Sequence, residues 1–152
     1  MRGISFIVKT SKKSDKLLYS ILKGISFDKY IWKIVESEIY RIDDGTTELF
    51  SKEIYNGIDF KNVIKFNEYQ VIFANIQAYK NNNQICELRN YEDFLISSCE
   101  IVILLVDCKF VEIYSKRYSI IEQIKSNVER LLFEDIEYIT DENDARTRFS
   151  VY

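Results

Sequence analysis

The apolar segment IVILLV, residues 101–106, constrains the fold more than any other part of the chain. It has no polar face, so a strand built from it has to be buried on both sides. The run is also far shorter than the roughly 20 apolar residues that a membrane-spanning helix needs. We therefore expect a central strand, in a sheet with helices above and below it.

Other segments rich in β-branched and aromatic residues predict further strands. They are residues 2–8, 30–35, 38–42, 48–55, 69–78, 110–114 and 136–140. The sequence Asp43-Asp44-Gly45 is typical of a turn, so the region around it is predicted to be an antiparallel meander.

Apolar residues at helical spacing predict helices in four places. These are a helix that follows Ser14, a short helix at residues 59–66, one that Asn90 caps, and one at residues 119–133 that begins with the capping box Ser119 and Glu122. No linker or repeat interrupts this order. We expect a single α+β domain, residues 1–152, in which three or four helices pack on a mixed, largely antiparallel sheet.

The composition excludes several chemistries. The chain has no histidine, which removes the commonest general base, Ser-His-Asp and Cys-His arrangements, and histidine-ligated zinc. Its four glycines are too far apart for a phosphate-binding loop or a dinucleotide fingerprint. Cys86, Cys99 and Cys108 form no Cys-x-x-Cys pair, and we expect them to be buried structural thiols. We expect no cofactor.

The net charge of −3 and the isoelectric point of about 5.2 give no overall attraction to nucleic acid or to an anionic membrane. The N-terminal segment MRGISFIVKTSKK lacks the apolar length and the cleavage site of a signal peptide. We therefore expect a cytoplasmic protein that binds neither nucleic acid nor membrane.

The segment TDENDARTRF, residues 140–149, is the densest group of charges near the end of the chain. It does not match an EF-hand, because Ala145 and Arg146 stand where that loop needs a ligand and a glycine. If the strands that end at Asp107 and Asp141 were parallel neighbours, these two carboxylates and Asp144 could hold one Mg²⁺. The alternative is that the aspartates only form turns.

Arg146 and Arg148 are two residues apart, so in an extended tail they point the same way. They could bind a phosphate ligand as a bidentate clamp. The alternative is that they pair with Glu142, with Asp144 or with the acids of residues 134–137.

Aromatic residues crowd the meander, and some of them are expected at an exposed sheet edge. We assign Tyr30, Trp32, Tyr40 and Tyr55 as candidate partner-binding residues, with half-buried sheet packing as the alternative. A homodimer through the meander edge is possible, because unpaired strands invite pairing.

Five stretches of the chain resemble, in order and spacing, one family of small bacterial proteins, the domain of unknown function 2691. They are MRGISF, VIFANIQAY, LRNYEDFL, CEIVILLVDC and EYITDENDARTRFSV. The resemblance covers essentially the whole chain, and it implies a single full-length domain in a bacterial cytoplasm. It implies nothing about mechanism, because the family has no established activity, cofactor or catalytic residue. The family's closing motif is Asp-Gly-Arg-Thr-Arg, whereas this chain has Ala145 at the second position, where a positive φ would be costly.

The sequence therefore favours a non-enzymatic cytoplasmic protein, of the accessory, immunity or inhibitor kind, that binds another protein. The alternative is a small metal-dependent hydrolase or phosphate-ligand-binding enzyme that uses the aspartates and arginines of the C-terminal motif. The two hypotheses differ in whether Asp107, Asp141, Asp144, Arg146 and Arg148 converge on one pocket.

Overall fold

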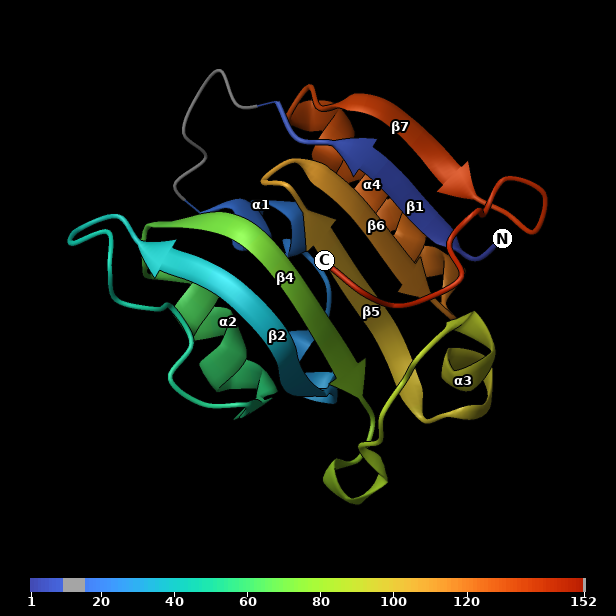
Figure 1. Cartoon of the computed structure of the whole chain (residues 1–152), viewed down its shortest axis with the longest axis horizontal. Helices are drawn as coiled ribbons and strands as arrows, with labels where there is room; N and C mark the ends of the chain where they lie inside the picture. The colour runs from blue at the N-terminus through green and yellow to red at the C-terminus, as the bar shows by residue number, and fades with distance from the viewer. Residues whose placement is uncertain (10–15, 152) are drawn as a thin grey trace.

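The computed structural model describes residues 1–9 and 16–151, and it shows a seven-stranded antiparallel sheet with helices packed on it (Figure 1). The strand order is β3-β2-β4-β5-β6-β1-β7. The strands are β1 (Gly3–Ile7), β2 (Ile31–Arg41), β3 (Ile54–Asn56), β4 (Tyr69–Tyr79), β5 (Cys99–Val106), β6 (Phe110–Ser115) and β7 (Glu134–Ile139). The predicted α+β class is confirmed, with every strand pair antiparallel.

Three α-helices lie behind the sheet in Figure 1, and one lies at its lower edge. They are α1 (Leu17–Leu22), α2 (Gly57–Lys65), α4 (Tyr118–Arg130) and, at the lower edge, α3 (Tyr91–Ile96). Two 3-10 turns, η1 (Phe27–Lys29) and η2 (Asn82–Gln84), complete the order. Among the described residues, no helix is both long enough and apolar enough to cross a membrane.

The sequence IVILLV forms most of β5, which lies fourth of the seven strands and is buried along nearly its whole length. Ile101, Ile103 and Leu105 pack on the helix side of the sheet. Val102 and Leu104 face the other side, which we call the open face, where α3 and the C-terminal tail (residues 145–151) cover part of the sheet. The prediction of a central strand buried on both faces is confirmed.

Several local predictions need correction. The strands predicted at residues 30–35 and 38–42 form one long strand, β2 (Ile31–Arg41), because two bulges let it stay paired with β4 throughout. Ser119 lies inside α4, and Glu122 accepts a hydrogen bond from the Tyr138 hydroxyl instead of capping the helix. Asn90 does cap α3, since its side chain accepts a 2.9 Å hydrogen bond from the backbone N–H of Asp93. The predicted cap Ser14 lies outside the described residues.

Candidate functional site

Asp107 lies in the hairpin turn between β5 and β6. Both Asp107 and Cys108 have positive φ angles, 52° and 66°, and the N–H of Lys109 donates to the carbonyl of Val106 at 3.2 Å. These are the features of a two-residue hairpin turn, in which aspartate is favoured because it tolerates the left-handed conformation. The role that the structure shows for Asp107 is therefore that of a turn residue.

The structure does not bring Asp107, Asp141 and Asp144 together. Asp107 lies where β6 begins, whereas Asp141 follows the end of β7, which lies level with Tyr114 near the end of β6. The magnesium hypothesis assumed parallel strands, but β5 and β7 run in opposite directions, so their carboxyl ends lie at opposite edges of the sheet. Among the described residues, no group of three or more acidic or cysteine side chains could hold a metal ion.

Asp141 and Asp144 instead share one cation, Arg2, which precedes β1. The Arg2 guanidinium donates to Asp141 at 2.8 Å and to Asp144 at 3.1 Å, and it stacks over the Tyr91 ring at 4.1 Å. The hydrogen bond from Arg2 holds the pKa of Asp141 below its usual value. Because the Asp144 side chain is only 1% exposed, this contact gives a buried carboxylate the partner that it requires.

Tyr114 links Asp144 to Glu112 across the open face. Its hydroxyl lies 3.1 Å from Asp144 Oδ1 and 3.2 Å from Glu112 Oε2, so its single proton serves one carboxylate at a time. Burial, followed by the charges of these two carboxylates, raises the pKa of Tyr114 well above its usual value. The hydroxyl therefore stays protonated and acts as a hydrogen-bond donor.

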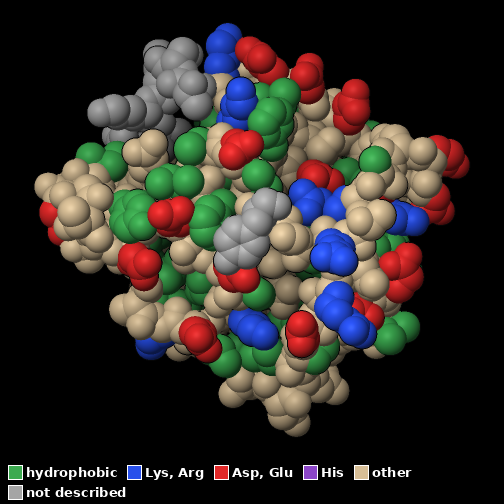
Figure 2. All heavy atoms as spheres, viewed as in Figure 1, with side chains coloured by type: hydrophobic (Ala, Val, Ile, Leu, Met, Phe, Trp, Pro, Cys, Tyr) green, Lys and Arg blue, Asp and Glu red, His purple; other side chains and the backbone are tan. Residues whose placement is uncertain are grey.

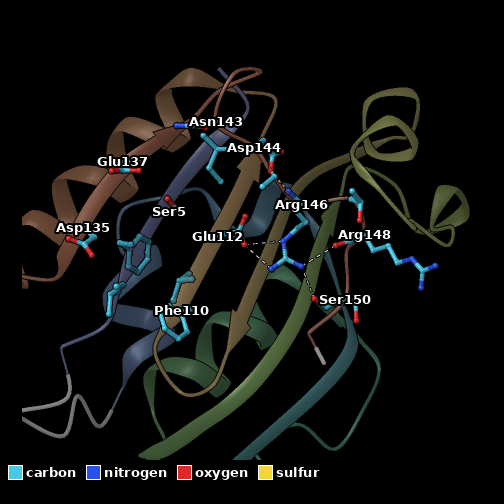
Figure 3. Close-up of a pocket in the computed structure, with 16 residues that line it drawn as sticks. Ser5, Phe110, Glu112, Asp135, Glu137, Asn143, Asp144, Arg146, Arg148 and Ser150 are labelled. Atoms are coloured by element: carbon cyan, nitrogen blue, oxygen red, sulfur yellow. Dashed lines mark hydrogen bonds and ion pairs between the residues drawn. The ribbon is translucent and has the colours of Figure 1, made fainter.

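Arg146 fastens the C-terminal tail to the sheet (Figure 3). Its Nε and Nη2 donate to Glu112 Oε1 at 3.0 and 2.8 Å, and its Nη1 donates to the carbonyls of Arg148 and Ser150 at 3.0 and 2.7 Å. The arginine and glutamate side chains are only 18% and 29% exposed. The guanidinium therefore already uses four of its five N–H donors within the protein and does not form a free phosphate clamp.

Arg148 is exposed, and its side chain points away from Glu112 in Figure 3. It forms no ion pair with the described residues. Of the two arginines, only Arg146 pairs with an acid of the described residues. Its partner is Glu112 of β6 and not one of the acids of residues 134–144 that we expected. The two arginine side chains therefore point apart instead of the same way (Figure 3).

The turn that precedes the tail is held by its own side chains. Asn143 Oδ1 accepts from the N–H of Thr140 at 2.8 Å, and Asn143 Nδ2 donates to the carbonyl of Tyr138 at 2.8 Å. Ala145 is not among the described residues with a positive φ. The turn therefore does not require glycine at this position, and alanine introduces no backbone strain here.

A groove of about 840 Å³ lies between the tail and the strands β6, β1 and β7, and we call it the acidic groove. Its sheet side is lined by Ser5, Ile7, Phe110, Glu112, Asp135 and Glu137. Glu112, Ser5 and Glu137 are cross-strand neighbours, so the three side chains form one row across the groove. Asp135 and Glu137 are exposed and form no ion pair with the described residues. In Figure 2 acidic side chains follow the β7 edge.

A second groove of about 660 Å³ lies on the other side of the tail, and we call it the amide groove. Its walls are β2, β4, residues 86–90 and the tail. Asn75 and Gln77 of β4 line it and are 4% and 1% exposed. Basic side chains gather around the tail on this face in Figure 2.

The candidate partner-binding aromatics lie mostly in the core. Tyr30, Trp32 and Tyr55 are 6%, 0% and 3% exposed, so the expectation that they lie at an exposed edge is wrong. The Trp32 ring stacks on Phe60 of α2 at 4.2 Å, which shows that α2 covers the meander. Tyr40 is partly exposed, and its hydroxyl donates to Glu38 at 3.0 Å.

The three cysteines lie in different environments, and all are free thiols. Cys99 is buried as predicted, and burial raises the pKa of its thiol to about 12. Cys108 is partly buried in the hairpin turn. Cys86 is exposed beside the amide groove, so the prediction of a buried thiol is wrong there.

Reasoning from the sequence missed Arg2, Glu112 and Tyr114. Glu112 and Tyr114 could have been found, because side chains alternate along a strand and Val111 and Ile113 occupy the core face. Arg2 carried no such signal, since its partners are 139 and 142 positions away in the sequence.

Comparison with known proteins shows the family. The family model described as "Protein of unknown function (DUF2691)" matches residues 1–150. The chain is also 35% identical, over 154 residues, to "Uncharacterized protein YncE" of Bacillus subtilis (strain 168), and the match covers 99% of each chain. No solved structure matches. The chain therefore belongs to this family of unknown function, which confirms the resemblance in its sequence.

Proposed function

We propose that this member of the DUF2691 family is a non-enzymatic, single-domain protein of the bacterial cytoplasm that binds another protein through the acidic groove. The observation that carries the proposal is a pair of exposed carboxylates, Asp135 and Glu137, which form no ion pair with the described residues and line the same groove as the exposed ring of Phe110. Phe110 is 45% exposed, although it lies on a strand whose next residue is buried.

The charge and the exposed aromatic ring of this groove indicate what kind of partner it would bind. Two exposed carboxylates that form no ion pair within the described part of the chain attract a segment that carries lysine or arginine, and this attraction increases the association rate. An exposed aromatic ring beside them offers an anchoring surface for an apolar side chain. We therefore propose that the partner presents a segment with basic and apolar residues, as an accessory, immunity or inhibitor protein would require.

The enzyme alternative has less support from the geometry. It needed Asp107, Asp141, Asp144, Arg146 and Arg148 to converge, but Asp107 lies at the opposite edge of the sheet and the arginines point apart. The carboxylate of Asp144 accepts hydrogen bonds from Arg2 and Tyr114, and the guanidinium of Arg146 already donates four hydrogen bonds to protein oxygens. Neither group is free to act on a substrate in this arrangement.

Site-specific photo-crosslinking tests the proposal. A benzophenone amino acid is placed at Phe110, and in a matched control at Phe66, which is 67% exposed at the end of α2 on the helix side. After irradiation in the native cell, we expect a defined protein adduct from position 110 only. The double variant Asp135→Asn, Glu137→Gln should lose most of this adduct, because the groove then lacks the two carboxylates that form no ion pair with the described residues.

The purified partner is then titrated at two salt concentrations. Its affinity should fall as salt rises, because exposed charges are screened beyond about 8 Å at physiological ionic strength. Equal adducts from positions 110 and 66, or an adduct that the charge-neutral variant retains, would refute the acidic groove as the binding surface. An adduct between two copies of this chain would instead support a homodimer.

A further inference from the structure

The amide groove contains a buried polar side chain with an open acceptor. Asn75 is 4% exposed, and its Nδ2 donates to the carbonyl of Phe149 in the tail at 3.4 Å. Its Oδ1 is buried and accepts no hydrogen bond from the described residues. Buried side-chain oxygens nearly always have a donor, so this oxygen lacks a partner that a ligand could supply.

The existing contacts of the groove indicate what kind of donor fits. Asn75 already binds the peptide carbonyl of Phe149, and the N–H of Phe149 donates to the carbonyl of Arg89 at 2.8 Å. The groove thus holds one extended peptide segment, its own tail, through backbone groups. A side-chain amide can bind a carbonyl and an N–H of peptide groups at the same time, and here only the acceptor half is open.

Charged side chains line the same groove. Arg148 and Lys33 line the groove and form no ion pair with the described residues, so they can meet a carboxylate. Glu36 and Glu87 line it as well, and neither forms an ion pair with the described residues, so they can meet an ammonium group. The volume of about 660 Å³ falls within the usual range for small-ligand sites, about 300 to 1,000 Å³.

We propose that the amide groove binds a short peptide with free termini. One of its backbone N–H groups donates to Asn75 Oδ1, and its terminal carboxylate pairs with Arg148 and Lys33. This site lies on the other side of the tail from Asp135 and Glu137, although Arg148 lines both grooves, and it does not depend on the protein-binding function proposed above.

The test titrates the full chain with trialanine and follows the backbone amides by NMR, with calorimetry for the dissociation constant. Two further probes are the C-terminal amide of trialanine, which lacks the carboxylate, and its N-methylated form, which lacks the N–H donors. The variants are Asn75→Leu and Arg148→Ala. The matched control is Arg130→Ala, an exposed arginine at the end of α4 on the other side of the sheet.

We expect trialanine to shift amides of residues 86–90 and 147–150. Removal of the carboxylate, or the change Arg148→Ala, should weaken binding at least about tenfold, which corresponds to about 1.4 kcal/mol. N-methylation and Asn75→Leu should have a similar effect, and Arg130→Ala should have none. Because Arg148 is exposed, its variant remains informative even if Asn75→Leu does not fold.

Two outcomes overturn the proposal. One is the absence of shifts at millimolar trialanine, and the other is binding that Arg148→Ala and the amidated probe leave unchanged. The variant Asp135→Asn, Glu137→Gln should bind trialanine like the wild type. Failure of the acidic groove and failure of this site are therefore distinguishable.

Discussion

Replacement of Arg146 by alanine tests the role of the tail most directly. The guanidinium makes four hydrogen bonds, two to Glu112 and two to the carbonyls of Arg148 and Ser150. Hydrogen bonds that involve a charged group contribute about 1.5 to 3 kcal/mol each when buried, and less when water reaches them. Because Arg146 and Glu112 are 18% and 29% exposed, we expect a total loss of about 2 to 4 kcal/mol.

The loss should be concentrated in the tail. Phe149 and Val151 pack on the open face, and Phe149 lies 5.0 Å from the Tyr114 ring. Without Arg146 their attachment weakens, so amide hydrogen exchange should accelerate in residues 145–151 before it does in β5. Denaturant unfolding gives the free energy, and exchange detected by mass spectrometry gives its location.

Two companion variants sharpen this experiment. Arg146→Lys keeps the charge but cannot reach Glu112 and two carbonyls together, so its stability should lie between those of the wild type and the alanine variant. Arg148→Ala, two positions further along, should change stability by less than about 0.5 kcal/mol. A loss at Arg146→Ala that is no larger than at Arg148→Ala, with unchanged exchange in the tail, would refute the fastening role.

Three further predictions concern the rest of the fold. Hydrogen bonds from Thr47 lower the pKa of Asp44 from 3.8 to about 2, so the stability that they add is present above about pH 4 and is lost as the pH falls toward 2. Asp44→Asn should therefore flatten the acid side of a plot of denaturation midpoint against pH. Gly3→Ala would place its Cβ 1.9 Å from a backbone oxygen of β6, so calorimetry should show a loss of more than about 2 kcal/mol. Phe60→Ala should cost about 3 to 5 kcal/mol in denaturant unfolding, whereas Phe66→Ala should cost less than about 0.5.

The elements that the sequence predicts well are those whose pattern is local. Residues 101–106 have no polar face, and this alone determines that β5 is buried on both sides. Residues 69–78 were likewise predicted as a strand, and β4 extends only one residue beyond them. The single long β2 was not predictable, because the bulges that keep it continuous arise from its register with β4.

The candidate metal site could not be predicted from a local pattern. Its prediction required knowledge of which strands are neighbours and in which direction they run, and no local pattern contains this information. Asp107 and Asp141 do follow strand ends, as predicted, but antiparallel pairing places the ends of β5 and β7 at opposite edges of the sheet. Likewise, aromatic residues at strand positions gave no sign of whether α2 would cover them. Trp32 is buried because Phe60 lies over it.

The charged residues of TDENDARTRF hold the C-terminal tail in place on the open face, where the tail forms a wall of each groove. Asp144 is held by Arg2 and Tyr114, and Arg146 is held by Glu112, so the tail crosses the open face at a fixed place. Residues 147, 148 and 150 line both grooves, which makes the tail their common wall. The contacts that hold Asp144 and Arg146 in place therefore also separate the acidic groove from the amide groove. A substitution at Arg146 should change both grooves together, although only one of them contains its side chain.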